Sequence, residues 1–294
     1  MTTAVVFLAR GEGHGLAATE AFLESYRAHP AGLDHELVVL IKGWERTAGR
    51  EIVESQARAL GATTIDLPDD GMDWGAYVRA ASRLDHDWVC FFNTHSQICA
   101  DGWLAALRRA AEQAGVGAAG ATGSWSTITP VFRFLAPTVV DYWRRKGPVK
   151  ALAAAVRLYV IRYLWHSVEN VFRFPGFPNP LLRINAFLVR RALFLTFAER
   201  HRIPLHKWET WVIEGGYTGF TRFLASQGLR VVVAGADGRA YEAEEWPDSR
   251  TFCVPDHSNL LVSDNRTRLY GAADPFSRRD IERTSWGRTF TSWR

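Results

Sequence analysis

Apolar runs that alternate with helical stretches constrain the first 125 residues most strongly. The runs are apolar at nearly every position rather than at every second one, which is typical of parallel strands covered by helices on both faces. The predicted strands are 4–10, 35–43, 62–68, 87–93 and 116–125, and the helices between them are 16–29, 50–61, 72–84 and 100–115. We therefore predict an α/β fold whose ligand site lies at the carboxyl ends of the strands.

The pattern changes after residue 126 and then resumes. Residues 127–180 read as a helical insertion or lid that ends in a proline-rich stretch, and 236–294 read as a loop-rich extension. Between them, 183–194 predicts a strand entering a helix, 207–228 a helix that ends at Gly228, and 229–235 a further strand. The expected organisation is thus one domain, 1–294, with an insertion and a C-terminal extension.

Charge and composition narrow the classes of partner. The 294 residues carry a formal charge of +4, with 47% hydrophobic and 22% charged residues, and no long basic run. This is ordinary globular composition, and it argues against a nucleic-acid-binding role. It is compatible with an anionic ligand such as a nucleoside diphosphate, or with a lipid surface. The first residues lack a signal-peptide pattern, so we expect a cytoplasmic protein.

The insertion is the part that suits a membrane surface. It combines aromatic residues with arginines, and Arg157 and Arg162 argue against a membrane-spanning helix. We expect a lid packed on the core or, alternatively, a peripheral membrane contact through 137–170, formed by residues that include Trp143, Arg144, Arg145, Tyr159, Tyr163 and Trp165.

Four stretches resemble one enzyme family in order and spacing. They are "DDGMDWGAYVRAA" (69–81), "FFNTHSQICADGWLAAL" (91–107), "NAFLVRRALF" (185–194) and "IEGGYTGFTRFLASQGLRVVVAG" (213–235). This arrangement resembles the GT-A glycosyltransferases, especially the inverting group around family 2 and the rhamnan-synthesis-like transferases. The resemblance implies a GT-A-like, mostly parallel sheet sandwiched by helices. It also implies transfer of a sugar from a nucleoside diphosphate to a glycan or lipid-linked acceptor in surface polysaccharide synthesis.

The family's Asp-x-Asp metal motif is altered here. The resemblance places Asn93 and His95 where the two aspartates sit. Mg²⁺ prefers hard oxygen ligands, whereas a neutral histidine suits Mn²⁺ or another transition ion. Two alternatives stay open: His95, with His257 as a further ligand, holds Mn²⁺, or the site is metal-independent and arginines hold the diphosphate, the candidates being Arg183, Arg191 and Arg268.

The donor site is expected to include the start of the helix at 72–84. Asp73 lies there between Gly71 and Gly75, and glycines in a first helical turn suggest that something passes close to the backbone. Asp73 can instead be a helix-capping residue. Arg10, at the end of the first strand, completes the expected donor-binding set of Asp73, Asn93, His95, Gly71 and Arg10.

The base candidates are Glu214 and Glu209. The resemblance aligns Glu214-Gly215 with the family's Glu-Asp pair, in which the aspartate is the base, so glycine replaces that base here. The two glutamates are five residues apart and cannot both point inward from one regular helix. Gly215 and Gly216 argue for close approach of a ligand or strand. Two alternatives to an enzyme remain: a catalytically inactive nucleotide- or glycan-binding relative, and a membrane-peripheral complex subunit.

Overall fold

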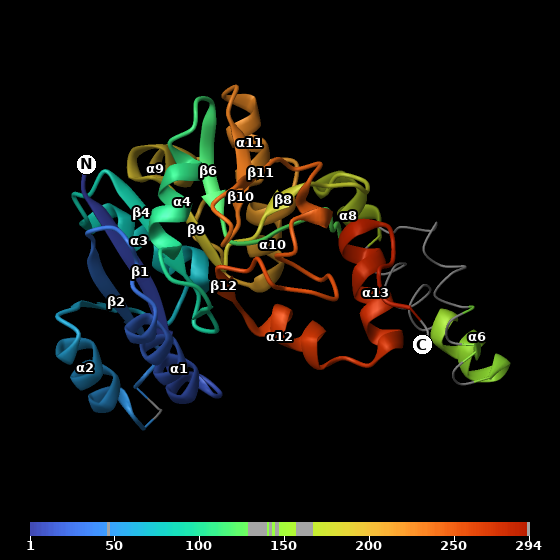
Figure 1. The fold of residues 1–294 in the computed structure, drawn as a ribbon, viewed down its shortest axis with the longest axis horizontal. Coiled ribbons are helices and arrows are strands. Elements are labelled where there is room, and N and C mark those ends of the chain that lie inside the picture. Colours follow the sequence, from blue (N-terminus) through green and yellow to red (C-terminus); the bar gives the residue numbers. More distant parts are fainter. Residues whose placement is uncertain (46–47, 129–139, 141–142, 145–146, 157–166, 293–294) are drawn as a thin grey trace.

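A computed structural model describes residues 1–45, 48–128, 140, 143–144, 147–156 and 167–292. Figure 1 shows a central sheet with helices on both sides and a helical arm beyond it. The helices are α1 (Gly15–Ala28), α2 (Arg50–Ala59), α3 (Met72–Arg83), α4 (Trp103–Ala111), α6 (Pro148–Val156), α8 (Ser167–Arg173), α9 (Arg191–Ala198), α10 (Lys207–Gly215), α11 (Phe220–Ser226), α12 (Asn265–Ala272) and α13 (Pro275–Trp286).

The main sheet has eight strands in the order β11-β10-β6-β9-β4-β1-β2-β3. Its strands are β1 (Thr3–Arg10), β2 (Glu36–Lys42), β3 (Thr63–Leu67), β4 (Trp88–Phe92), β6 (Val116–Gly120), β9 (Ala186–Arg190), β10 (Arg230–Ala234) and β11 (Ala240–Tyr241). Strands β3, β2, β1 and β4 are parallel to one another, as are β6 and β10. Strand β9 lies antiparallel between β4 and β6. The predicted α/β class, a largely parallel sheet sandwiched by helices, is confirmed.

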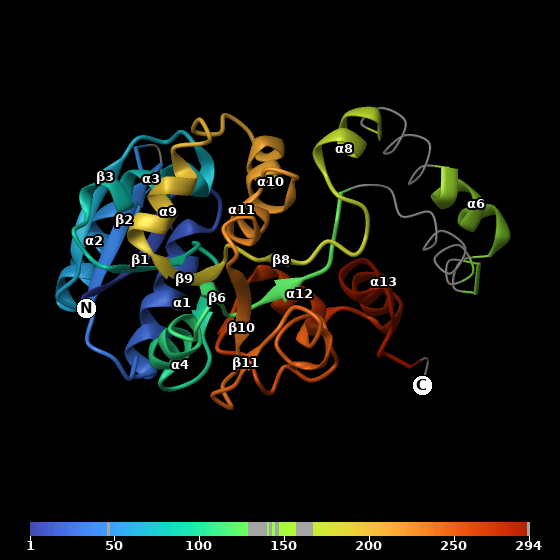
Figure 2. The same cartoon turned by 90° about the horizontal axis from the view of Figure 1, so that it is seen from above.

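Each face of the sheet has its own core, because the strands are apolar on both sides. Figure 2 shows α3, α9, α10 and α11 on one face and α1 and α4 on the other. On the first face Trp74, Phe91, Phe187, Phe194 and Phe220 pack together. The second face is packed by buried residues of α1, α2 and α4. The face carrying α3 and α10 is the one that matters for the candidate site.

The segment 207–228 forms two helices rather than the single helix predicted. Helix α10 ends at Gly215, Gly216 is extended (φ −74°, ψ 175°), and α11 begins after Gly219. A Cβ on Gly216 would lie 2.6 Å from the Val212 carbonyl oxygen and 3.0 Å from that of Arg173. The chain therefore turns where α8 packs against it.

The C-terminal residues 236–294 are less loop-rich than expected. They contain α12, α13 and the short 3₁₀ helix Trp246–Asp248. Strand β12 (Val262–Ser263) returns to pair antiparallel with β5 (Gln97–Ile98), directly after the turn that follows β4. A third small sheet joins β7 (Gly123–Ser124) to β8 (Leu181–Leu182). Late residues of the chain are thus brought to the carboxyl end of β4.

The predicted insertion contains α6 and α8 among its described residues, and α6 lies away from the main sheet (Figures 1 and 2). The lid prediction also rests on Arg145, Arg157, Tyr159, Arg162, Tyr163 and Trp165, which lie outside the described residues. Within the described part of the chain, no helix has the length and apolar character needed to cross a membrane.

Candidate functional site

Five polar residues continue the strands where their apolar stretches end, and we call them the polar row. Leu8, Leu40, Phe91 and Phe187 face the core under α3 and α10. Because side chains alternate along a strand, the residues two positions further along belong to the same face. The polar row runs across five neighbouring strands and consists of Lys42 (β2), Arg10 (β1), Asn93 (after β4), Asn185 (before β9) and Thr122 (after β6).

One end of the polar row is made of amides and a hydroxyl. The Asn93 N–H donates to the Asn185 carbonyl oxygen (3.2 Å), which places the two residues opposite each other. Thr122 Oγ1 donates to Asn185 Oδ1 (2.9 Å). Asn185 Nδ2 is buried and has no hydrogen-bond partner within the described residues. Such a donor costs free energy unless water or a ligand accepts its hydrogen.

The other end is cationic. Arg10 and Lys42 are directly paired across β1 and β2. Lys42 is 1% exposed, and its Nζ donates to the Met72 carbonyl oxygen (2.8 Å) and lies 3.9 Å from Asp69 Oδ1. Arg10 Nη2 lies 2.5 Å from Glu12 Oε2 and 3.7 Å from Asp69 Oδ1. Lys42, Asn185 and Thr122 were absent from the sequence-based candidates, although the alternation that locates Arg10 and Asn93 also locates them.

The turn after β4 uses most of its polar groups to hold itself together. Asn93 Oδ1 accepts from the His95 N–H (3.1 Å) and from Ser96 Oγ (3.0 Å). Ser96 Oγ also contacts the Asn185 carbonyl oxygen (2.7 Å), and Thr94 Oγ1 donates to the Leu8 carbonyl oxygen (2.8 Å). The His95 side chain is exposed. Residues 93–96 therefore form a turn closed by its own hydrogen bonds.

Glu214, in the last turn of α10, lies close enough to Asp73 and Arg183 to interact with them electrostatically, and its carboxyl is unpaired among the described residues. Burial raises its pKa from 4.5 to about 7, while Arg183 and Lys207 lower the pKa and the Asp73 carboxylate raises it. Within the described residues, no group hydrogen-bonds the Glu214 carboxyl. A carboxyl with a pKa near 7 changes protonation state at neutral pH, which suits proton transfer.

Asp73 and Tyr77 lie one helical turn apart on α3, and both interact electrostatically with Glu214 of α10. Tyr77 is fully buried and stacks on Phe91 (ring centroids 4.6 Å apart). Its hydroxyl has no hydrogen-bond partner within the described residues. Burial raises the pKa of Tyr77 well above 10, and the Asp73 and Glu214 carboxylates raise it further. The two carboxylates and the phenol thus share one electrostatic environment.

Glu209 has a different setting at the start of α10. Its Oε2 accepts from the Leu205 N–H (2.6 Å), which holds the pKa of Glu209 below its ordinary value. Arg202 and His206 also lie 3.5 Å and 3.6 Å from its carboxylate oxygens. An ionised carboxylate bound by the free N–H groups of a helix start has a structural role. Of the two predicted base candidates, the geometry favours Glu214.

Two predicted diphosphate-binding arginines lie beside the polar row. Arg183 Nη2 donates to Asp264 Oδ2 (2.7 Å), and Arg183 Nη1 donates to Thr122 Oγ1 (3.3 Å). Asp264 is buried and also caps α12. Arg268, on α12, is exposed, and its Nη2 donates to the His95 carbonyl oxygen (3.0 Å). The charge of Arg183 is thus compensated within the protein, whereas the guanidinium of Arg268 is accessible.

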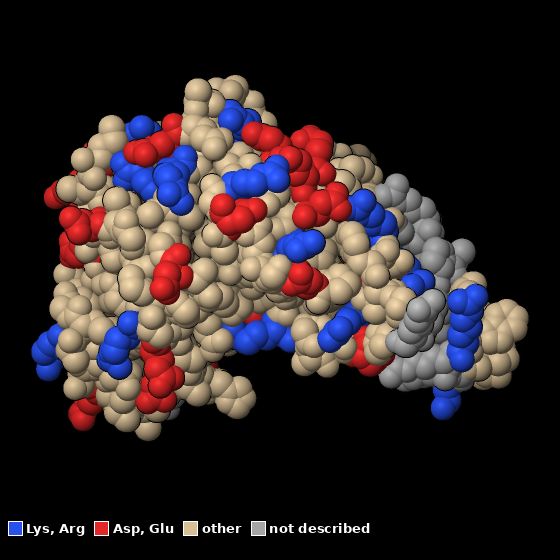
Figure 3. Space-filling model, viewed as in Figure 1, with Lys and Arg blue, Asp and Glu red and all other residues tan. Residues whose placement is uncertain are grey.

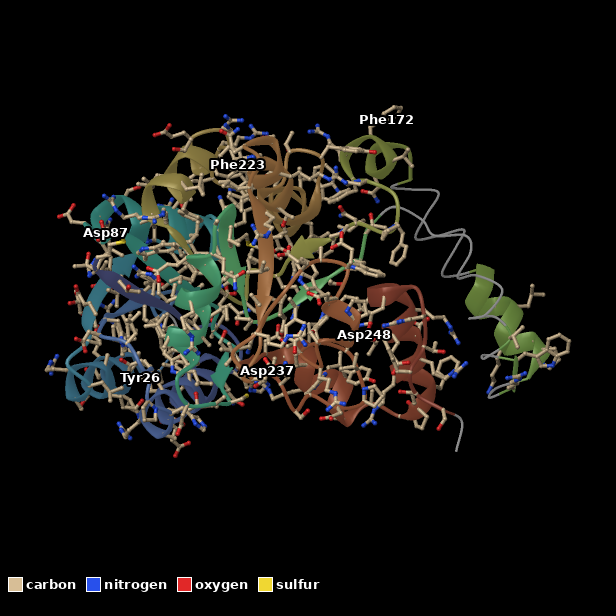
Figure 4. All side chains as sticks on the ribbon, turned by 45° about the horizontal axis from the view of Figure 1, so that its top comes forward. Tyr26, Asp87, Phe172, Phe223, Asp237 and Asp248 are labelled. Atoms are coloured by element: carbon tan, nitrogen blue, oxygen red, sulfur yellow. The ribbon has the colours of Figure 1, made fainter. Side chains whose placement is uncertain are left out.

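The third predicted arginine, Arg191, lies at the opposite end of the strands, near the amino end of β4. Its N–H donates to the Asp87 carbonyl oxygen (3.0 Å) and its Nε to that of His86 (3.0 Å), at the amino end of β4. Figure 4 labels Asp87 at this end of the strands. The expected placement fails because β9 runs antiparallel to β4, so the residues after β9 emerge far from the strand carboxyl ends.

The glycines of both motifs are explained by packing within the chain. A Cβ on Gly71 would lie 2.4 Å from Ile203 Cγ2, and one on Gly75 would lie 2.9 Å from the same atom. A Cβ on Gly215 would lie 2.9 Å from Leu181 Cδ2 of β8. The close approach predicted from these glycines is therefore made by Ile203 and β8, and Gly71 contributes a backbone turn (φ 69°).

The predicted metal ligands do not form a donor set of their own. Among the described residues, no group of three His, Cys, Asp or Glu side chains is placed to hold a metal ion. The His257 ring, the second predicted ligand, packs against Tyr270 in a tilted arrangement (ring centroids 5.4 Å apart), and burial lowers the pKa of His257. Asn93 Oδ1 is occupied by two donors of its own turn. These residues therefore do not fit a protein-built Mn²⁺ site.

The margin that carries the site includes several basic side chains. Figure 3 shows Lys and Arg side chains, with a few Asp and Glu side chains among them, along the lower margin of the molecule in the area of α12. Cationic side chains near strand carboxyl ends are suited to an anionic ligand.

No family model matches the chain, and no curated protein is significantly similar to it in sequence. Among solved structures, one similar protein is a mannosyltransferase from Pyrobaculum calidifontis in complex with GDP-Man and Mn²⁺. The match has 15% identity and a TM-score of 0.45, and it covers 84% of this chain and 59% of that one. The chain thus spans less than two thirds of the length of this relative.

Two further structures show the range of the likeness. Glucosyl-3-phosphoglycerate synthase from Mycobacterium tuberculosis, in complex with Mn²⁺, UDP and glucosyl-3-phosphoglycerate, matches at 18% identity and a TM-score of 0.36, covering 65% of this chain and 57% of that one. CMP:2-keto-3-deoxy-manno-octonic acid synthetase in complex with CTP matches at 12% identity and a TM-score of 0.42, covering 80% and 90%. At these values the likeness assigns no activity to this chain.

Proposed function

We propose that this protein transfers a sugar from a nucleoside diphosphate to a hydroxyl acceptor, with Glu214 as the general base. The observation that carries the proposal is the unpaired Glu214 carboxyl, whose pKa is about 7, beside Asp73 at the carboxyl edge of the sheet. The motif order that resembles the inverting GT-A enzymes supports the choice of reaction. Asp73, Asn93 and Arg10 line the donor side in this proposal.

The proposed step balances as a single displacement. The acceptor hydroxyl oxygen forms a bond to the sugar C1 while the bond from C1 to the diphosphate oxygen breaks. The hydroxyl proton moves to the Glu214 carboxylate, and the nucleoside diphosphate leaves with the electron pair. Because attack comes from the face opposite the leaving group, the configuration at C1 inverts. A base with a pKa near the working pH is suited to this proton transfer.

The leaving diphosphate requires positive charge near the turn after β4. Arg268 is the accessible candidate, because its guanidinium contacts the His95 carbonyl oxygen and is otherwise exposed. Arg183 is a weaker candidate, since Asp264 already neutralises it. Arg10, along the polar row, is likewise a weaker candidate, since Glu12 and Asp69 compensate its charge.

The proposal is tested by incubating the protein with UDP-, GDP- and TDP-sugars and an oligosaccharide or lipid-linked acceptor mixture, with and without Mn²⁺. Thermal-shift measurements with UDP, GDP, TDP and CMP first identify which nucleotide the protein binds, because a ligand that binds the folded state raises the melting temperature. Product formation that Glu214→Gln abolishes supports transfer. Nucleotide binding without turnover would favour a binding protein instead.

The acceptor side of the proposal includes a surface that meets anionic lipid. Trp143, Val149 and Leu152 are 60%, 79% and 67% exposed, and they lie beside exposed Arg144 and Lys150. Phe172 on α8 is 76% exposed, and Figure 4 shows its side chain pointing outward. Exposed apolar side chains among cations suit the interface of an anionic membrane.

Vesicle flotation tests this surface. We expect the protein to float with vesicles rich in phosphatidylglycerol and not with phosphatidylcholine vesicles. The double variant Val149→Glu/Leu152→Glu should remain at the bottom of the gradient, whereas Leu269→Glu, a change at an exposed leucine on α12, should float normally. Equal flotation of the wild type and the α6 variant would exclude this surface as the contact.

A further inference from the structure

Helix α3 begins with a backbone conformation that its sequence does not favour. Gly71 and Met72 both have positive φ, 69° and 52°. Glycine adopts this left-handed conformation freely, but a side chain with a Cβ does so at a cost in free energy. Strain of this kind persists only where the surroundings hold it, and it gathers at functional sites. Met72 directly precedes Asp73, so its conformation determines where Asp73 points.

The contact that holds Met72 comes from the end of β2. The Lys42 ammonium donates to the Met72 carbonyl oxygen (2.8 Å) and is buried with its residue only 1% exposed. Its other near partner, Asp69 Oδ1, is 3.9 Å away, which is an ion-pair distance and too long for a hydrogen bond. Burying an ammonium is costly unless it is paired. The Met72 carbonyl oxygen therefore stabilises the buried ammonium of Lys42, and the ammonium in turn stabilises the conformation of Met72.

The Asp73 carboxylate acts electrostatically on both this lysine and Glu214. Burial lowers the pKa of Lys42, and the neighbouring Asp69 and Asp73 carboxylates raise it. The same Asp73 carboxylate raises the pKa of Glu214. Further along α3, Tyr77 anchors the helix to the sheet through its stack on Phe91. The helix is thus fixed at Tyr77, and its first turn is fixed by Lys42.

We propose that Lys42 is a positioning residue: by holding Met72 in the left-handed conformation, it keeps the Asp73 carboxylate beside Glu214. The inference rests on the proposed function, because it gives this arrangement a purpose in tuning the base. It reaches beyond that function, since, among the described residues, the polar contacts of the Lys42 ammonium are with the Met72 carbonyl oxygen and Asp69, not with Glu214. A lysine that only filled the core would have no need of a strained Met72.

The strain suggests a rescue experiment. Lys42→Met removes the ammonium and retains a long apolar side chain. Met72→Gly removes the cost of positive φ, so the chain can keep the same turn without Lys42. The double variant should therefore recover what Lys42→Met loses. A lysine needed only for core stability would gain nothing from a glycine at position 72.

The readout is the titration of the Glu214 carboxyl, followed by NMR in protein with ¹³C-labelled glutamate side chains. Groups that set its pKa are Asp73 on α3, Arg183 after β8 and Lys207 on its own helix. Displacement of Asp73 removes a pKa-raising charge. The Glu214 midpoint should thus move to lower pH in Lys42→Met, as in Asp73→Asn, and return to the wild-type midpoint in Lys42→Met/Met72→Gly.

Turnover gives a second readout where activity is found. Lys42→Met should lower kcat by about 10²-fold, the cost of a small misplacement at a reacting centre, with a smaller change in KM. Met72→Gly should restore most of the kcat. Arg58→Met, which removes a cation from the exposed face of α2, should behave as wild type in both measurements.

Each outcome decides the matter. A wild-type Glu214 midpoint in folded Lys42→Met overturns the proposal, as does a midpoint that Met72→Gly fails to restore. If Lys42→Met does not fold but the double variant folds and titrates as wild type, the proposal is supported. If neither folds, Lys42 acts through more than Met72 and the proposal is wrong. Because titration needs no substrate, absence of sugar transfer would sink the proposed function while leaving this test intact.

Discussion

The turn after β4 and the end of α10 lie on the same face of the sheet and differ in how their polar groups are used. In the turn, the side-chain oxygens of Asn93, Thr94 and Ser96 each make hydrogen bonds within the protein. At the end of α10, the Glu214 carboxyl has an elevated pKa and no hydrogen-bond partner among the described residues. The polar groups of the turn are satisfied within the protein, whereas the Glu214 carboxyl is free to accept a proton or a hydrogen bond from a ligand.

The difference shows that the position of a residue in a sequence motif does not determine whether its side chain is free to bind a ligand or accept a proton. The turn was predicted to lie where a metal motif would, yet its side-chain oxygens are used in hydrogen bonds within the protein. Glu214 was predicted from a pattern in which glycine follows it instead of aspartate, and burial raises its pKa to about 7. Buried groups that lack partners are the ones that ligands can satisfy. The following predictions test this comparison, from the largest expected effect to the smallest.

The largest effect should come from Glu214→Gln. Removing a general base lowers turnover by about 10²–10⁴-fold, while nucleotide binding should persist because the amide keeps the shape of the side chain. Steady-state rates and thermal shifts with the bound nucleotide check both parts. Glu209→Gln is the matched control and should retain most activity. A large loss in Glu209→Gln with a normal Glu214→Gln would reverse the comparison.

The same Glu214→Gln variant should be more stable than wild type at pH 8. The folded pKa is raised from 4.5 to about 7, so the folded protein holds a proton that the unfolded chain releases between these values. The contribution of Glu214 to stability is therefore highest below pH 4.5 and falls as pH rises to about 7.

The expected gain at pH 8 is about 1–3 kcal/mol, because the roughly 1.4 kcal/mol for each pH unit between 4.5 and about 7 is reduced by the partial solvent exposure of Glu214. Denaturant unfolding at pH 4 and pH 8 measures it, and the difference between the two proteins should vanish at the lower pH. An equal difference at both pH values would show that Glu214 does not titrate as described.

A smaller effect is expected for Asn93→Ala. The change removes the oxygen that accepts from the His95 N–H and Ser96 Oγ, so the turn should lose about 1–3 kcal/mol of stability. Nucleotide binding should weaken in parallel, because the turn borders the polar row. Asn93→Asp keeps an acceptor oxygen at the Oδ1 position and serves as the control. Unchanged stability and unchanged nucleotide affinity in Asn93→Ala would remove the turn from the proposed site.

The smallest effect should come from His95→Ala. The His95 side chain is exposed, and the turn uses only its backbone groups. Stability should stay within about 0.5 kcal/mol of wild type, and the thermal shift with nucleotide should not change with or without Mn²⁺. Loss of a Mn²⁺-dependent shift in this variant would instead identify His95 as a metal ligand.

Strand and helix order was predictable because it depends on local patterns. The apolar runs at 4–10, 35–43 and 87–93 gave the strands, and the same alternation locates Arg10 and Asn93 at their ends. The direction of β9 was not predictable in this way, because strand pairing depends on distant contacts. That missing direction is the reason Arg191 was expected in the site and lies at the other end of the strands.

Residue roles that depend on tertiary contacts could not be predicted from the sequence either. Lys42 looked like the polar end of a strand, and only the position of the Met72 carbonyl shows what it binds. The two glycines at 215–216 indicated close approach, but the sequence could not show that α10 ends there against α8 and β8. The separation of Glu214 from Glu209 likewise comes from burial and from the Leu205 N–H.

The return of the late chain to the end of β4 has a consequence for synthesis on the ribosome. All eight strands of the main sheet have left the ribosome once Tyr241 is outside. Strand β12, the Asp264 partner of Arg183 and the Arg268 contact to the β4 turn come only later. A chain that ended at Tyr241 would therefore contain every strand of the main sheet but none of these contacts, and it would also lack the core residues Tyr270 and Trp286.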